Sequence, residues 1–271
     1  MKRAAINAFA LALAAGCARA PGAAPDALTA PAGRVTFELR SAPTSGLPPT
    51  FAVTACFWSG GETPTLDGGS PTPCRGSVVS GCCLSDVDPG IDRQGCTDEN
   101  VDVGPVQLLA NGAVIGTASL TSGNYALSPG GSPSWKAGDR LEVRGGGTNG
   151  FPAFDVSVVA AAAPALSQPT VGAGTALAFA RTQPLLFSWS PAATASSAET
   201  WISATEPQSG DLESADCFAP GNPGQASFPA GMLSNLPAGL GTAEVALEND
   251  AMAGPVEIVS RGETELAVQT Q

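Results

Sequence analysis

The sequence predicts an all-β protein with two tandem β-sandwich domains that follow a signal peptide and a flexible tether. Three observations support this fold class. Apolar and polar residues alternate over several short segments, as on strands with one buried face. Stretches rich in glycine, proline, asparagine and aspartate separate these segments and are typical of turns. Beyond the first 16 residues there is no sustained helical periodicity.

The first predicted domain covers residues 34–163. It begins with Val35, Phe37 and Leu39, which alternate with polar residues. Asn111-Gly112 indicates a hairpin, because both central positions of its turn require positive φ. We expect the remaining strands of this domain at 51–57, 106–110, 113–120, 141–144 and 154–159.

The second predicted domain covers residues 170–271. Alanines 160–163 and the prolines at 164 and 169 break the strand pattern, so we place a domain boundary there. About 100 residues suffice for one immunoglobulin- or fibronectin-like sandwich. Pro229 to Leu236 is the one predicted helical turn, with Met232, Leu233 and Leu236 facing a core. The predicted strands are 175–181, 184–190, 199–205, 212–218, 241–248, 254–260 and 262–269.

The N-terminal segment predicts export. A cationic start at residues 1–3 precedes a short apolar run at residues 4–15, which is too short to span a bilayer as a helix. Leu13-Ala14-Ala15-Gly16-Cys17 resembles the lipobox of bacterial lipoproteins, except that its leucine lies four residues before the cysteine instead of three. The resemblance implies a signal peptide at residues 1–16 and a lipid-modified Cys17. The alternative is an ordinary secretory signal cleaved near Ala20.

Residues 17–33 then form the lipidated cysteine and a flexible tether of small, turn-forming residues. Ala18 is not the aspartate that marks retention in the inner membrane, so the resemblance implies an outer-membrane lipoprotein. The expected partner is therefore the membrane, held through the lipid anchor.

The composition excludes several function classes. The chain contains no histidine, which rules out Ser-His-Asp and Cys-His catalysis and histidine-ligated metals. It carries 12 basic against 24 acidic residues, so a nucleic-acid partner is not expected.

Six cysteines remain after Cys17, an even number that indicates disulfides in an exported chain. Five lie in the first predicted domain and one in the second. Either one bond crosses between the domains, or Cys217 and one other cysteine are free. Adjacent cysteines seldom pair with each other, so we expect Cys82 and Cys83 to reach partners on opposite faces of a strand or turn. The candidates are Cys56, Cys74, Cys82, Cys83, Cys96 and Cys217.

Two parts of the sequence have features of binding sites for small ligands. Asp86, Asp88 and Asp92 lie in the acidic stretch 86–102 and resemble part of a Ca²⁺-binding loop, although Pro89 departs from the EF-hand pattern. The alternative, which we prefer, is a solvated acidic loop without a cofactor. Trp135 lies in a predicted turn beside Lys136 and is the most exposed candidate among the four tryptophans, where it would stack on a sugar ring. The alternative, which we prefer, is that each tryptophan has a structural role.

The body of the chain also resembles uncharacterised secreted two-domain β-sandwich proteins of high-GC Gram-negative bacteria. The shared features are Ser188 to Pro191, Cys217-Phe218 and Phe228 to Pro237, in that order. The resemblance carries no known activity. We therefore expect a non-enzymatic interaction or adhesion role at the cell surface, with a protein or glycan partner. A carbohydrate- or calcium-binding module is the alternative, and a carboxylate-dependent hydrolase is a more distant one.

Overall fold

The computed structural model describes residues 33–41, 48–58, 75–79, 81–85, 100–127, 134–148, 150–172, 175–190, 195–208, 210 and 212–271. These residues form strands and one short helix, which confirms the predicted all-β class. The elements are β1 (Gly33–Ser41), β2 (Thr50–Phe57), β3 (Arg75–Val79), β4 (Cys82–Ser85), β5 (Val106–Ala110), β6 (Ala113–Thr121), β7 (Asn124–Leu127), β8 (Arg140–Gly145), β9 (Phe154–Val159), β10 (Ala165–Gln168), β11 (Leu177–Phe179), β12 (Leu185–Ser190), β13 (Ser197–Thr205), β14 (Leu212–Pro220), β15 (Gln225–Phe228), α2 (Ala230–Leu233), β16 (Gly239–Ala253) and β17 (Val256–Thr270).

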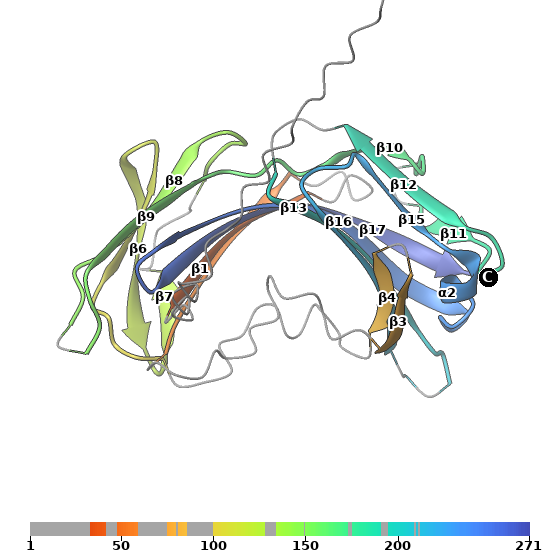
Figure 1. The fold of residues 1–271 in the computed structure, drawn as a ribbon, viewed down its shortest axis with the longest axis horizontal. Coiled ribbons are helices and arrows are strands. Elements are labelled where there is room, and N and C mark those ends of the chain that lie inside the picture. Colours follow the sequence, from red (N-terminus) through yellow and green to blue (C-terminus); the bar gives the residue numbers. More distant parts are fainter. Residues whose placement is uncertain are drawn as a thin grey trace, which may run out of the picture.

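A nine-stranded sheet forms the centre of the molecule. Its strands lie in the order β2-β1-β17-β16-β13-β14-β4-β3, and β11 pairs with the end of β17. The hairpin strands β16 and β17 have 15 residues each and run through the middle of this sheet. The sheet arches, and the two smaller sheets lie on its convex side (Figure 1).

The five-stranded sheet, β7-β6-β5-β8-β9, encloses the first core against one end of the large sheet. Alternation brings Val35 and Phe37 of β1 into this core, as the sequence predicts. The predicted hairpin is also confirmed: Asn111 and Gly112 have φ of 51° and 80° and connect β5 to β6.

The three-stranded sheet, β10-β12-β15, encloses a second core at the other end. Phe187, Phe228 and Leu236 are fully buried there. The predicted helical turn is confirmed as α2, which places Met232 and Leu233 in the same core. The apolar clusters of the two cores share no residue, and each is packed between two sheets, so the architecture is that of a β-sandwich.

The prediction of two tandem domains is not confirmed, because one sheet runs through both halves. Strand β1 pairs in parallel with β17 over its whole length, from Gly33 opposite Val256 to Ser41 opposite Thr264. The predicted break between strands 254–260 and 262–269 is wrong, since β17 runs through it without interruption. A parallel pairing across more than 200 residues leaves no local pattern in the sequence.

The predicted boundary at 160–169 is a segment that crosses the convex face of the large sheet. The amide of Ala161 donates to Ser260 Oγ at 2.9 Å, and Thr264 Oγ1 donates to the Pro164 carbonyl at 2.7 Å. Between these bonds, a Cβ added to Gly262 would lie 2.3 Å from the Ala162 carbonyl carbon. Glycine at 262 therefore permits this close approach and does not end the strand.

Candidate functional site

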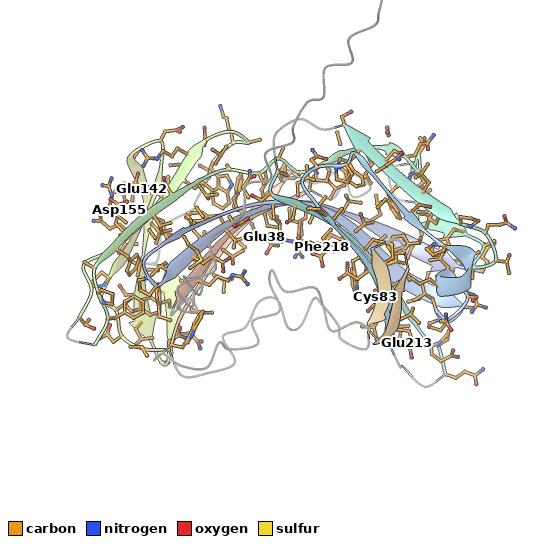
Figure 2. The ribbon with its side chains drawn as sticks, in the orientation of Figure 1. Glu38, Cys83, Glu142, Asp155, Glu213 and Phe218 are labelled. Carbon is orange, nitrogen blue, oxygen red and sulfur yellow. A yellow bond between two sulfur atoms is a disulfide. The ribbon has the colours of Figure 1, made fainter. Side chains whose placement is uncertain are left out.

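The concave face of the large sheet carries a network of charged side chains. On β17, Ile258, Leu266 and Val268 face the cores, so the alternating residues Arg261 and Glu263 face the concave side. Figure 2 shows Glu38 and Phe218 on the same side.

The strand register aligns these residues in rows across the sheet. One row contains Phe218, Glu199, Ala246, Glu263 and Arg40, contributed by β14, β13, β16, β17 and β1 in turn. Side chains that are directly opposite on one face of a sheet lie close enough to interact.

A neighbouring row contains Ser197, Glu248, Arg261 and Glu38. On the other side, a third row contains Cys83, Asp216, Trp201, Glu244 and Glu265. The network therefore extends over three rows.

Arg261 is the centre of the network, with ion pairs to four glutamates. Its Nη1 lies 2.9 Å from Glu199 Oε2 and also pairs with Glu248. Its Nη2 pairs with Glu244, and its Nε lies 3.1 Å from Glu263 Oε2. One guanidinium thus connects β13, β16 and β17 through the side chains of the sheet.

Glu263 connects this centre to a second arginine. Its other oxygen, Oε1, accepts a hydrogen bond from Arg40 Nε. Arg40 Nη2 also donates to Glu38 Oε1 at 2.7 Å, and its Nη1 lies 3.7 Å from Glu265. The eight residues of this ionic network are Glu38, Arg40, Glu199, Glu244, Glu248, Arg261, Glu263 and Glu265.

The ionic network has six carboxylates and two guanidinium groups, and its centre is buried. Arg261 is 6% exposed and Glu263 is 2% exposed. Burial, together with the nearby carboxylates of Glu244 and Glu38, raises the pKa of Glu263 to about 8, although both arginines act in the opposite direction. Burial disfavours the charge on Arg261, but the surrounding glutamates outweigh it and hold the pKa of Arg261 well above its ordinary value.

The side chains that solvent reaches lie at the margin of the ionic network. Arg40 and Glu265 have 36% and 37% of their side chains exposed. Phe218 is 37% exposed and occupies the same row as Arg40. This face thus offers the exposed ring of Phe218 beside an ionic network with more acidic than basic side chains.

One of the two alternatives for the cysteines is confirmed: a disulfide joins the two predicted domains. Cys82 of β4 and Cys217 of β14 are direct neighbours in the sheet and form a disulfide with their Cα atoms 3.9 Å apart. Cys82 faces the second core, whereas Cys83 lies toward the concave side (Figure 2). Cys56 and Cys83 are disulfide-bonded as well. The other predicted positions, Cys17, Cys74 and Cys96, lie outside the described residues, as do Asp86, Asp88 and Asp92.

Trp135 has the structural role that we prefer for the tryptophans, and the alternative of an exposed, sugar-stacking ring is wrong. Only 5% of this residue is exposed, and its ring packs against Phe37 and Phe51 with centroids 5.3 and 4.9 Å apart. The predicted turn beside it does exist, but its indole turns inward to complete the first core. A buried indole offers no face to a sugar.

The ionic network was not predicted. A signal for it was present, since Arg261, Glu263 and Glu265 alternate in the sequence and so do Glu38 and Arg40. The predicted break between strands 254–260 and 262–269 falls at Arg261 and separates it from the two glutamates. Within the described residues, no group of acidic and cysteine side chains is arranged to hold a metal ion. No helix among them is both long and apolar enough to cross a membrane.

Comparison with known proteins gives one structural similarity. No family and no curated protein matches the chain. Among solved structures, the fibronectin(III)-like modules of CbhA from Clostridium thermocellum are similar over 74% of this chain and 93% of theirs. The two are 13% identical, with a TM-score of 0.21.

Proposed function

We propose that this protein is an exported outer-membrane lipoprotein, anchored through Cys17, whose folded part is a non-enzymatic interaction module. The observation that carries the proposal is the charged concave face of the large sheet. Three strands of this sheet, β2, β4 and β14, contain disulfide-bonded cysteines. Cys82, Cys217, Cys56 and Cys83 are all disulfide-bonded, and stable disulfides are typical of chains that leave the cytosol. This supports export, which the lipobox resemblance also implies.

The proposed binding surface is the accessible margin of the ionic network. Phe218 supplies exposed apolar area of the type that anchors protein partners. The surrounding glutamates outnumber the arginines, which favours a protein partner with basic side chains. The central ion pairs hold the neighbouring strands of this face together, so the partner meets an organised surface.

We also propose that the two cores correspond to two sandwich units of the immunoglobulin or fibronectin class. Each core has its own small sheet, and the clusters have separate members. The shared strands β16 and β17 would couple the two units, so we expect a single calorimetric unfolding transition.

The anchor is tested by fractionating cells that express C17S or, as a control in the tether, A20S. We expect A20S to remain in the outer-membrane fraction and C17S to leave it, and mass spectrometry of the wild-type N-terminal peptide to show acylated Cys17. An unmodified N-terminus near residue 21, with C17S distributed like the wild type, would refute the lipid anchor.

The interaction face is tested by cross-linking in intact cells. F218S and E265K change the proposed surface, and V114S changes an exposed valine on the five-stranded sheet as a matched control. We expect the two face variants to reduce the cross-linked product at least tenfold, while V114S retains it. Equal yields from all three variants would exclude this face as the binding surface.

A further inference from the structure

Strand β2 forms one edge of the large sheet, and the backbone of Phe57 points away from the sheet at this edge. The Phe57 amide donates to Asn100 Oδ1 at 2.9 Å, and the Phe57 carbonyl accepts from the Val101 amide at 2.7 Å. Gly33 lies opposite Phe57 on β1, and its amide donates away from β2, to the Pro255 carbonyl next to β17. Gly33 and Phe57 are therefore a pair without hydrogen bonds between them.

The same pattern continues along β2 and leaves part of the edge open. The register between β1 and β2 has no shift, and in an antiparallel ladder the pairs with and without hydrogen bonds alternate. Phe51 and Val53 lie an even number of residues before Phe57, so their N–H and C=O groups also point outward. Within the described part of the chain, these groups of Phe51 and Val53 have no hydrogen-bond partner. They are available to an additional strand.

The side chains of the open edge alternate between two environments. Phe51 and Val53 are half-buried and pack against the first core. Ala52 is exposed on the concave side, opposite Glu38 of β1. Glu38 belongs to the ionic network, in which carboxylates outnumber guanidinium groups, and 15% of its side chain is exposed. Because Ala52 is small, a long side chain next to it on an added strand can extend over it to Glu38.

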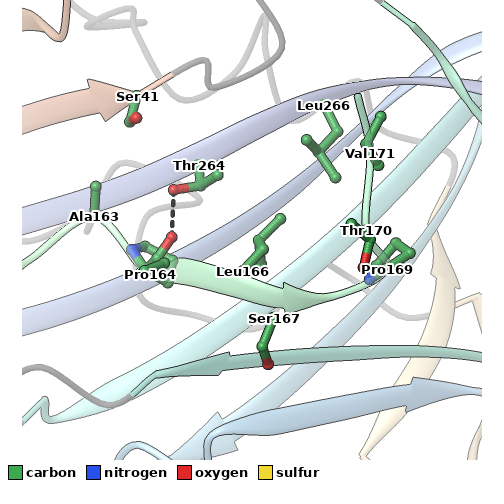
Figure 3. Close-up of a pocket in the computed structure, with 11 residues that line it drawn as sticks. Ser41, Ala163, Pro164, Leu166, Ser167, Pro169, Thr170, Val171, Thr264 and Leu266 are labelled. Carbon is green, nitrogen blue, oxygen red and sulfur yellow. Dashed lines mark hydrogen bonds between the residues drawn. The ribbon is translucent and has the colours of Figure 1, made fainter. Parts of the chain in front are cut away.

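Strand β10, at one edge of the three-stranded sheet, is protected in ways that the open part of β2 is not. A register shift interrupts β10 between Leu166 and Gln168, and prolines precede and follow the strand. Figure 3 shows that the Pro164 carbonyl already accepts a hydrogen bond from Thr264 Oγ1. Bulges and prolines prevent edge strands from pairing with other chains. Strand β2 has neither a bulge nor a proline from Thr50 to Phe57.

We infer that this edge binds an extended segment of a protein partner as an added antiparallel strand, with apolar residues opposite Phe51 and Val53 and a basic residue opposite Ala52. The outward N–H and C=O groups form four hydrogen bonds with the added strand. The apolar residues cover the half-buried side chains, and the basic residue reaches the Glu38 carboxylate. Four strands separate β2 from β14, which carries Phe218, so this second surface goes beyond the proposed function.

The test uses the full-length C17S chain with its disulfides intact and the peptide Thr-Val-Lys-Val-Thr, blocked at both ends. Nuclear magnetic resonance titration gives the affinity and identifies the amides that shift. We expect one peptide per chain, with the largest shifts at Phe51 and Val53. Replacing the peptide lysine by glutamate should weaken binding about tenfold. N-methylation of both peptide valines removes the donors to β2 and should also weaken binding about tenfold.

Variants of the protein separate the backbone from the side chains. V53P removes an outward N–H group that β1 does not use, whereas V53T keeps this group and has a similar shape. We expect V53P to weaken the peptide about tenfold and V53T to bind it within about threefold of C17S alone, with circular dichroism confirming each fold. E38Q should abolish the preference for lysine over glutamate and retain the effect of N-methylation.

Three results overturn the inference: no binding of the peptide to C17S, equal binding of the N-methylated peptide, or full binding by folded V53P. A dimer of C17S that V53P dissociates also overturns it, because a second copy then occupies the edge. The peptide variants decide the question even where V53P does not fold. Phe218 takes no part in this measurement, so its outcome and that of the cross-linking experiment are independent.

Discussion

Replacing Glu263 by glutamine tests whether the buried carboxyl group controls the pH dependence of stability. Glu263 is 2% exposed, and its pKa in the folded protein is about 8, against an ordinary value of 4.5. The folded state binds the proton of the Glu263 carboxyl group more tightly than the unfolded state does. The contribution of this group to the free energy of unfolding is therefore complete below pH 4.5 and is lost as the pH rises through 8. At about 1.4 kcal/mol per pH unit, the interval between these two pKa values limits the contribution of Glu263 to the free energy of unfolding to about 5 kcal/mol.

Glutamine has nearly the same shape as glutamate and cannot ionise. The stability of E263Q therefore does not fall through ionisation at position 263 as the pH rises. We expect the free energy of unfolding of E263Q, minus that of the wild type, to increase between pH 5 and pH 9 by several kcal/mol. Urea unfolding at five pH values, under non-reducing conditions, measures this difference.

E265Q is the matched control, because it removes one carboxylate from the same strand and retains Glu263. We expect its stability to follow the wild-type pH dependence. Parallel curves for E263Q and the wild type over the whole range would refute the reasoning, even if E263Q were less stable by a constant amount.

Three further predictions concern the fold. G262A should destabilise the protein by about 1 to 3 kcal/mol, since the added Cβ meets the crossing segment. G146A is the control, because a Cβ at Gly146 has free space and should change the stability little. Urea unfolding compares the two variants. The double variant C82S/C217S should lose up to about 5 kcal/mol, because the bond closes a loop of 135 residues; chemical unfolding measures this, and an unchanged midpoint contradicts it. W135A should cost about 3 to 5 kcal/mol, and wild-type thermal stability would contradict its place in the core.

Local patterns in the sequence predicted most individual strands correctly. Alternation at Val35 and Phe37 fixes which side chains of β1 are buried, and Asn111-Gly112 fixes a turn, because both effects depend on residues that are close in the chain. Phe187 and Trp189 likewise alternate with exposed or half-buried neighbours along β12, and both are buried.

The errors have one physical origin, which is packing between segments far apart in the chain. Trp135 is buried because Phe37 and Phe51 come to meet it, and a turn sequence contains no information about them. The crossing segment around Ala162 lies against Gly262 in the middle of β17, and the residues near Gly262 in the sequence contain no information about that segment.

The sequence by itself determined the all-β class, the strand faces and the even number of cysteines available beyond Cys17. Only the tertiary structure decided that β1 lies beside β17, so that one sheet joins both cores. That pairing brings Arg40 to Glu263 and completes the ionic network around Arg261. Strand pairing at long range depends on which exposed edges and apolar faces fit together, and this is a property of the whole chain.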